Sequence, residues 1–337
     1  MISADEHGEI GAMRRTFAWL HRALLSGLAV FLAAGAWAQV YPNRSIRIVV
    51  PFSAGGANDN VARTVGQKLS EALGQPVVID NRPGGATNVG TEIVAKAPPD
   101  GHTLLLNNSS LVTNVNLYSA LPYDFRRDLA PITLIATTPL VLVSHPSLPV
   151  KSVKELVALA KSKPGQLTYG SAGIASPAHI CGELLNSMAK IRILHVPYKG
   201  GTQAIADVLG GQITLAFTGG PAAIALTKAG KLRALGTTGA RRFTIAPEIP
   251  TIAESGVPGY ELVGFFALYA PGGTPQSVIA RLNTEAVKGL AQPDARKRIT
   301  ATGAEVAASS SQELKAFLEK ESDKYAKLIR SANIRLE

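Results

Sequence analysis

Short apolar segments alternate with amphipathic ones along the first two thirds of this chain, and this alternation restricts the fold most strongly. Runs of four to six residues rich in Val, Ile and Leu are typical of buried strands, whereas an apolar repeat of four is typical of helices. The expected strands are 46–51, 77–80, 103–106, 140–144, 168–170, 193–196, 213–217 and 232–237. The expected helices between them are 59–73, 89–96, 153–161, 178–188, 203–209 and 222–228. Such alternation predicts an α/β fold with mainly parallel sheets flanked by helices.

The last third of the chain has a different pattern. Turn signals at Pro258-Gly259 and at 271–275 are followed by segments with helical periodicity. We expect these helices at 275–290, 293–301 and 311–332. With 337 residues, of which 46% are hydrophobic and 17% charged, the chain is long enough for two globular domains.

The formal net charge of +10 favours acidic solutes or surfaces. The Lys and Arg residues are scattered, however, and form no run of the kind found in nucleic-acid-binding arms. We therefore expect no nucleic-acid partner. His and Cys residues also lack the spacing of a metal site, so we expect no metal and no cofactor.

The first 38 residues are typical of a signal peptide. Three arginines precede the apolar segment 23–32, and an A-x-A cleavage site follows at Ala36-Trp37-Ala38. A transmembrane anchor is the alternative, but 23–38 is shorter than the ~20 apolar residues that span a bilayer. We expect cleavage near Ala38-Gln39 and a periplasmic location. The pair Arg14-Arg15 leaves export by the general or the twin-arginine route open.

Cys181 is the only cysteine, so the chain has no intrachain disulfide. An exported protein without disulfides depends on its hydrophobic core for stability.

Three loops share one design, in which an expected strand runs through glycine into the start of a helix. They are 53–59, 170–176 and 196–202. A helix N-terminus presents unpaired backbone N–H groups and a partial positive charge, and this combination binds anions. Three such loops at one cleft predict a carboxylate ligand. Each loop alone is equally consistent with a purely structural turn.

Several residues of these loops are consistent either with ligand binding or with a purely structural role. Asp59 could orient the first loop or only begin its helix, and His179 could support a helix cap at Ser176. Tyr198 and Lys199 could contact a ligand, or they could be a packing tyrosine and a solvated lysine.

Catalytic motifs are missing from the sequence. No G-x-S-x-G nucleophile turn and no G-x-x-x-x-G-K-[ST] phosphate loop occurs. Ser171, Ser176 and His179 lie close together in sequence, but a catalytic triad also needs a group that orients the base. A hydrolase that uses these three residues is the alternative to a binding protein.

Motifs in a fixed order give the chain a resemblance to the Bug family, the solute-binding proteins of tripartite tricarboxylate transporters. The resemblance extends from Tyr41 to the C-terminus. The motifs are Tyr41-Pro42, Val50-Pro51-Phe52 with Gly55-Gly56 and Asp59, Asn81-Arg82-Pro83-Gly84, Asp100-Gly101-His102-Thr103-Leu104, Leu121-Pro122-Tyr123-Asp124, Gly173 with Ser176 and His179, His195-Val196-Pro197-Tyr198-Lys199-Gly200, Pro250-Thr251 with Glu254, and Ala270-Pro271 with Gly273-Thr274-Pro275.

This resemblance implies a two-lobed periplasmic-binding-protein fold of type II, with two crossover strands as the hinge. Lobe 1 would comprise 41–139 and 259–337, and lobe 2 would comprise 140–258. The implied ligand-binding residues are Phe52, Ala54, Gly55, Gly56, Asp59, Asn108, Ser109, Ser171, Gly173, Ser176, His179, Tyr198, Lys199, Gly200 and Thr218.

The resemblance further implies a small carboxylate ligand, such as a di- or tricarboxylate, an acidic amino acid or an aromatic acid. A permease of the inner membrane is the implied partner, and a monomer is expected. The effector-sensing part of a regulator shares this architecture, but the signal peptide opposes that alternative. Ala175 and Thr87 stand where the family usually has glycine, and Ala175 could tighten or re-aim the ligand loop, so the ligand class carries over poorly.

Overall fold

The computed structural model describes residues 41–174, 176–198 and 200–331. Arg44–Glu337 belongs to one compact unit and Met1–Asn43 to another, of which only the last three residues are described. The expected signal peptide and its cleavage site therefore lie outside the described residues. Within the described part of the chain, no helix has the length and apolar character needed to cross a membrane.

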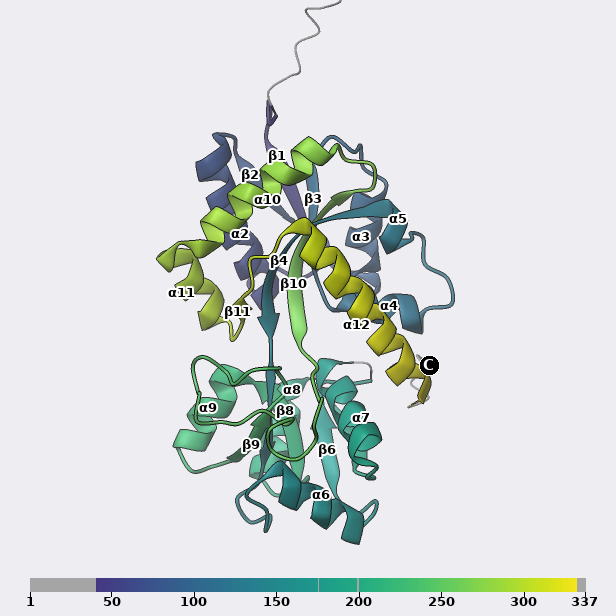
Figure 1. The fold of residues 1–337 in the computed structure, drawn as a ribbon, viewed down its shortest axis with the longest axis vertical. Helices are drawn as coiled ribbons and strands as arrows, with labels where there is room; N and C mark the ends of the chain where they lie inside the picture. The colour runs from purple at the N-terminus through teal and green to yellow at the C-terminus, as the bar shows by residue number, and fades with distance from the viewer. Residues whose placement is uncertain (1–40, 175, 199, 332–337) are drawn as a thin grey trace, which may run out of the picture. The chain divides into compact units, whose positions relative to one another are not determined.

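Two sheets form the framework of the compact unit (Figure 1). The first has the order β11-β4-β10-β3-β1-β2 and the second the order β7-β6-β8-β5-β9. Strands of the first sheet are β1 (Ile46–Val50), β2 (Val77–Asn81), β3 (Thr103–Asn108), β4 (Leu129–Thr138), β10 (Gly264–Pro271) and β11 (Glu305–Val306). Strands of the second are β5 (Leu140–Ser144), β6 (Thr168–Ser171), β7 (Leu194–Pro197), β8 (Leu215–Gly219) and β9 (Arg233–Thr237).

Both sheets are mixed, so the expectation of mainly parallel sheets is wrong in this detail. Strand β1 pairs in parallel with β2 and β3, whereas β10 is antiparallel to β3 and β4. In the second sheet β6 is parallel to β7 and β8, whereas β5 is antiparallel to β8 and β9. Strand β10 is antiparallel to β4 because the chain leaves the first sheet along β4 and returns to it along β10.

The passage between the sheets is short. Strand β4 ends at Thr138 and β5 begins at Leu140, so only Pro139 separates a strand of one sheet from a strand of the other. In Figure 1, β4 and β10 lie side by side and run from the first sheet toward the second. All eight residues of β10 are buried. The two strands thus form the connection between two α/β lobes.

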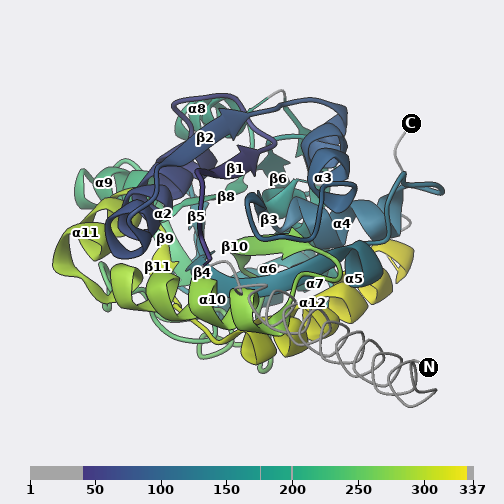
Figure 2. The same ribbon diagram turned by 90° about the horizontal axis from the view of Figure 1, so that it is seen from above.

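Helices cover both faces of the first sheet. They are α2 (Ala57–Leu73), α3 (Asn88–Ala95), α4 (Ser110–Leu117), α5 (Phe125–Asp128), α10 (Gln276–Ala291), α11 (Pro293–Ala301) and α12 (Ser311–Ser331). Figure 2 shows α2 and α11 on one side of the strands and α3 and α4 on the other. Helix α2 packs on α10, and α12 packs on α4 and β4.

The second sheet is also buried on both faces, by α6 (Val153–Ser162), α7 (Pro177–Ala189), α8 (Gly201–Leu209) and α9 (Gly220–Lys228). Neighbouring residues of β5 demonstrate this burial. Leu142 packs in one core cluster with residues of α6 and α7, whereas Val141 and Val143 pack in another with residues of α8 and α9. Successive side chains of a strand point to opposite faces, so the sheet is the middle of three layers.

The helices and strands predicted from the sequence are confirmed, with ends that differ by at most two residues. In α2, the repeat of Val61, Val65 and Leu69 is buried as predicted. Several elements were missed, among them both connecting strands and the helix that follows β3. These are β4, β10, β11, α4, α5 and a short 3-10 helix at Gly85–Thr87.

Candidate functional site

Loops at the carboxyl ends of β1, β3, β6 and β7 lead directly into the N-termini of α2, α4, α7 and α8. In open α/β sheets, ligands bind at this end of the strands. Because an amino-terminal helix turn has unpaired N–H groups, each loop offers donors for an acceptor or an anion.

The loop between β1 and α2 is held by Asp59. Its carboxylate accepts hydrogen bonds from the Gly55 N–H at 2.9 Å, from Arg63 Nε at 2.8 Å and from Asn81 Nδ2 at 3.1 Å. Asn81 also donates to the Phe52 carbonyl at 3.0 Å, so the end of β2 fixes the start of the loop. Of the two roles considered for Asp59, orientation of the loop is the one that this geometry supports.

The Asp59 carboxylate is ionised despite being buried. Burial would raise its pKa, but the hydrogen bonds from Arg63, Gly55 and Asn81 outweigh burial, so the pKa lies below its usual value. The charge of Arg63 acts in the same direction. Asp59 is therefore a fixed anchor for the loop, and its charge is already paired.

Gly55 and Gly56 are exposed at the tip of this loop and have different backbone conformations. Gly55 has φ +84°, a region that favours glycine, whereas Gly56 has φ −81° and is the N-cap of α2. No side chain caps α2, so its first-turn N–H groups have no partner of that kind. A Cβ at Gly56 would meet only the Ser53 carbonyl, at 3.7 Å. The absent side chain thus leaves the start of α2 open to an approaching molecule.

The loop between β6 and α7 is organised around Ser171. Its hydroxyl donates to the Gly173 carbonyl at 2.9 Å, accepts the Gly173 N–H at 3.1 Å and lies 2.6 Å from Nε2 of His195. Since the hydroxyl proton is used by Gly173, we assign the proton of the third bond to His195 Nε2. Ser171 is 1% exposed, and its hydrogen-bonding capacity is full.

The rings of His179 and His195 stack beside this loop, with centroids 3.9 Å apart and planes inclined by 12°. Burial lowers the pKa of both histidines to about 4, and for His179 the neighbouring His195 acts in the same direction. Both rings are neutral near pH 7. The backbone N–H of His179 also donates to the Ser176 hydroxyl, which confirms Ser176 as the cap of α7.

In the loop between β7 and α8, the side chain of Tyr198 is already hydrogen-bonded within the protein. The Tyr198 hydroxyl donates to Asp207 at 2.6 Å, and burial together with Asp207 raises its pKa to about 12. Lys199 lies outside the described residues. Gly200 is the N-cap of α8 without a side-chain cap, and a Cβ there would meet nothing within 4 Å. As at Gly56, the backbone is open to an approaching molecule.

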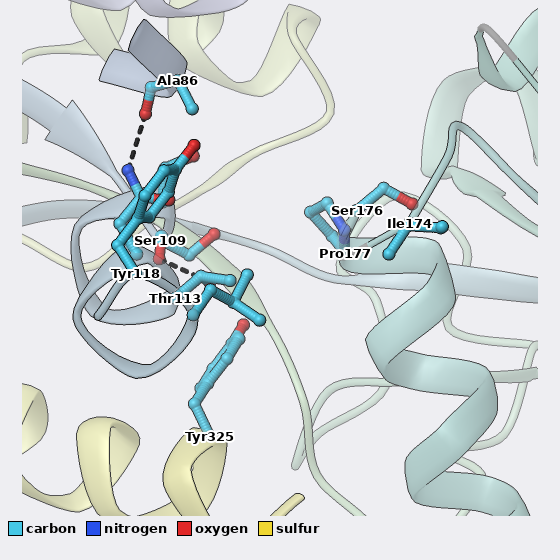
Figure 3. Close-up of a pocket in the computed structure, with 11 residues that line it drawn as sticks. Ala86, Ser109, Thr113, Tyr118, Ile174, Ser176, Pro177 and Tyr325 are labelled. Carbon is cyan, nitrogen blue, oxygen red and sulfur yellow. Dashed lines mark hydrogen bonds between the residues drawn. The ribbon is translucent and has the colours of Figure 1, made fainter. Parts of the chain in front are cut away.

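A cavity of about 210 Å³ lies between the start of α4 and the start of α7 (Figure 3). We call it the α4–α7 pocket. In Figure 3, Ala86, Ser109, Thr113, Tyr118 and Tyr325 lie on one side of it and Ile174, Ser176 and Pro177 on the other. Its full lining is Ala86, Ser109, Ser110, Thr113, Asn114, Leu117, Tyr118, Ile174, Ser176, Pro177 and Tyr325.

Of the expected ligand-binding residues that the structure describes, Ser109 and Ser176 line this pocket. The other described ones lie at the ends of β3 and β6, on the loops after β1, β6 and β7, or in the first turns of α2 and α7, and Thr218 lies near the end of β8. The Asn108 side chain accepts from the Ser110 N–H at 2.9 Å and so supports the start of α4. Three contributors were missed: Asn81, His195 as the partner of Ser171, and Tyr325. Asn81 and His195 stood within the motifs of the resemblance, whereas no signal marked Tyr325.

The loop that carries Ala86 has an unusual backbone. Ala86 and Thr87 have φ +51° and φ +80°, and Thr87 is β-branched, so both occupy a region that costs free energy for such residues. Asn114 holds this loop, because its Nδ2 donates to the Ala86 carbonyl at 2.6 Å and to Asn88 Oδ1 at 3.0 Å. Thr87, where the family usually has glycine, is therefore accommodated in a left-handed conformation at the rim of the pocket.

The hydrolase alternative receives no support from this geometry. Ser171 is buried and saturated, Ser176 is a helix cap, and the His179 ring stacks on His195. In the described part of the chain, no carboxylate lies within ion-pair distance of His195, the histidine that does contact Ser171. Over those same residues, no group of three or more His, Cys, Asp and Glu side chains could hold a metal ion.

Comparison with known proteins gives consistent matches over most of the chain. Residues 61–334 match the family model described as Tripartite tricarboxylate transporter family receptor. The chain is 34% identical to Protein BugT of Bordetella pertussis (strain Tohama I), over 93% of this chain and 98% of BugT.

Solved structures also match most of the chain. The structure titled R. palustris Rpa4515 with adipate shares 36% identity with a TM-score of 0.72, over 88% of this chain and 99% of that one. MatC (Rpa3494) from Rhodopseudomonas palustris with bound malate shares 30% identity with a TM-score of 0.68, over 86% of this chain and 100% of that one.

Proposed function

Because this chain belongs to the tripartite tricarboxylate transporter receptor family, which confirms the resemblance to the Bug proteins, we propose that it captures a small carboxylate between its two lobes. The family is one of receptors, and the chain acts by binding without chemical conversion. The ligand is held at the loops that follow β1, β6 and β7, where lobe 1 (41–139 and 259–337) faces lobe 2 (140–258).

One observation carries this proposal. Gly56 and Gly200 are the N-caps of α2 and α8, neither helix has a side-chain cap, and a Cβ at either glycine would meet no close neighbour. A carboxylate can therefore approach the unpaired N–H groups of the first turns directly. Two relatives solved with adipate and with malate support a carboxylate as the ligand class.

Hydrogen bonds, more than helix dipoles, supply the affinity. A micromolar dissociation constant corresponds to about −8 kcal/mol, whereas one helix dipole contributes about 0.3–1 kcal/mol. Charge-assisted hydrogen bonds contribute about 1.5–3 kcal/mol each, so three or four of them from backbone N–H groups and hydroxyls reach micromolar affinity. Asp59 in the β1–α2 loop and Ser171 in the β6–α7 loop hold neighbouring donors in place before the ligand arrives, which lowers the entropic cost of binding.

We propose that residues 1–38 are the export signal and that the mature protein acts in the periplasm as a monomer. There, closure of the lobes presents a surface to an inner-membrane permease of the tripartite type. Small-angle X-ray scattering in the presence of adipate and malate tests the closure, and NMR of the recovered ligand tests for conversion. We expect a smaller radius of gyration with unchanged ligand. A converted ligand would overturn the proposal, as would the absence of compaction when the site is saturated.

A further inference from the structure

We propose that the α4–α7 pocket is a subsite for the uncharged, hydrogen-bonding end of the ligand, and that the Tyr325 hydroxyl of α12 selects for it. The ligand would then be a carboxylate with one charged end and a hydroxyl or carbonyl at the other. This inference rests on the proposed function, because the charged end is assigned to the loops after β1, β6 and β7.

The lining of the pocket is the first argument. Hydroxyl groups come from Ser109, Ser110, Thr113, Tyr118, Ser176 and Tyr325, and among the residues that the structure describes no Lys, Arg, His, Asp or Glu lines the pocket. With about 210 Å³, the pocket has room for the end of a small ligand and less than the volume typical of a complete ligand site. A polar but uncharged group fits such a lining best.

The Tyr325 hydroxyl is the second argument. Tyr325 is 1% exposed, and burial raises the pKa of its hydroxyl, an effect that a weak interaction with the Ser109 side chain partly offsets. Among the described residues, this hydroxyl has no hydrogen-bond partner of good geometry. It lines the pocket from α12, more than 140 residues from Ser176 in the sequence, with the buried Ser109 beside it (Figure 3). A buried hydroxyl without a partner destabilises a protein, unless a bound molecule supplies the missing bond.

Other donors of the pocket are already in use. The Asn114 amide donates to Ala86 and Asn88, and the Thr113 hydroxyl donates to the Ser109 carbonyl at 3.0 Å. Tyr325 and Ser109 therefore remain as the buried hydroxyls that can bind an incoming group. A hydroxyl on the ligand suits them, because it can both donate and accept a hydrogen bond.

A second carboxylate fits this pocket less well. Helices α4 and α7 both begin here, and their dipoles favour negative charge. Their effect is small, however, compared with the cost of removing a full charge from water without a cationic partner. We therefore expect discrimination against dicarboxylates whose second charge must enter the α4–α7 pocket.

Matched ligands and matched variants test the inference by calorimetry. Adipate and 6-hydroxyhexanoate have the same number of carbons and differ in the charge of one end, as do succinate and 4-hydroxybutanoate. One of the two chain lengths will fit the site better. For that pair, we expect the wild-type protein to bind the hydroxy acid about tenfold more tightly than the dicarboxylate. Tyr325→Phe should reduce that preference by about three- to tenfold, the range expected for one hydrogen bond, and Ser109→Ala should reduce it in the same direction.

The sign of the stability change separates a ligand contact from a structural role. Tyr325→Phe removes an unpaired buried hydroxyl, so the melting temperature without ligand should not fall. Tyr269→Phe is the matched control, because the Tyr269 hydroxyl is also buried without a partner but lines a different cavity, with Phe125 and Leu129. Tyr269→Phe should leave the affinity for the dicarboxylate and the affinity for the hydroxy acid unchanged.

Three results would count against the inference. A wild-type preference for the dicarboxylate of both pairs would overturn the ligand class. An unchanged preference in Tyr325→Phe and Ser109→Ala would overturn the role of these residues while the proposed function stands. Absence of binding for every carboxylate would overturn the proposed function, and this inference with it.

Discussion

The imidazole rings of His179 and His195 stack face to face, with centroids 3.9 Å apart, at the point where α7 begins and β7 passes beside it. Tyr169 also stacks on His195, with the two ring centroids 5.0 Å apart. Burial favours the neutral form of both rings, and two imidazolium ions in contact would in addition repel each other. The protonation state of the site is thus linked to the stability of the second sheet and its helices.

Acid should destabilise the protein through these two histidines. Their pKa is about 4 in the folded protein and about 6.5 when unfolded, so between these values the unfolded chain binds more protons. Each ring therefore lowers the free energy of unfolding by up to about 1.4 kcal/mol per pH unit as the pH falls from 6.5 to 4. Urea denaturation from pH 7 to 4.5 measures this slope.

A variant that lacks one of the two rings is the control for this prediction. His195→Gln keeps a donor for Ser171 and removes the titration of that ring, so its pH slope should be shallower than the wild-type slope. Equal slopes in the two proteins would refute the account of the stacked pair.

Asp59→Asn should weaken both the fold and the site. The variant loses the charge that binds Gly55, Arg63 and Asn81, which predicts a loss of about 1–3 kcal/mol in the free energy of unfolding and weaker ligand binding. Because the pKa of Asp59 is lowered, its contribution is present above about pH 4 and is lost as the pH falls through the folded value. Chemical denaturation and calorimetry measure the two effects.

Glu92→Gln is a matched control, since Glu92 forms an exposed pair with Lys96 on α3. This change should shift the free energy of unfolding by less than about 1 kcal/mol and leave the affinity unchanged. If Asp59→Asn resembled this control, Asp59 would not be the anchor of the loop.

Gly56→Leu should separate binding from folding. Gly56 has an ordinary φ of −81° and space for a side chain, so the free energy of unfolding without ligand should change by less than about 0.5 kcal/mol. A bulky side chain would nevertheless block the first turn of α2, and calorimetry should detect no carboxylate binding. Gly55→Ala should instead cost about 1 kcal/mol of stability, because Gly55 has φ +84°. Wild-type affinity in Gly56→Leu would remove this loop from the site.

Gly182→Ala should destabilise lobe 2 by overpacking. A Cβ at Gly182 on α7 would overlap the ring of Tyr169, which cannot move freely because its hydroxyl donates to Glu183 at 2.6 Å and its ring stacks on His195. We expect a loss of about 1–3 kcal/mol in a urea denaturation experiment. The exposed Gly210→Ala has only ordinary contacts and should be nearly neutral. Similar values for the two variants would show that the Tyr169 ring is not fixed.

The sequence predicted the regular α/β units well because local patterns determine them. Periodicity located α2, and the cap at Ser176 with Pro177 located the start of α7. The connecting strands were missed because their patterns are atypical. Strand β10 is apolar throughout and buried on both faces, so it lacks alternation, and β4 contains Pro131, a residue that argues against a strand. A register shift beside Pro131 accommodates it in the ladder with β10.

Contacts within the site depend on long-range pairing that local patterns do not contain. His195 reaches Ser171 because β7 pairs with β6 in a register that places His195 opposite Tyr169. Tyr325 reaches the α4–α7 pocket because α12 packs on α4. Loops, caps and glycines of the site could thus be predicted from the sequence, whereas the partners of their side chains could not.

Calorimetric titration of the purified protein against dicarboxylates, hydroxy acids, acidic amino acids and aromatic acids tests the central claim most directly. The account predicts that at least one of these carboxylates binds at a one-to-one ratio with a micromolar or tighter dissociation constant and is recovered unchanged. Absence of binding across the whole panel would contradict the account, and so would conversion of the bound compound.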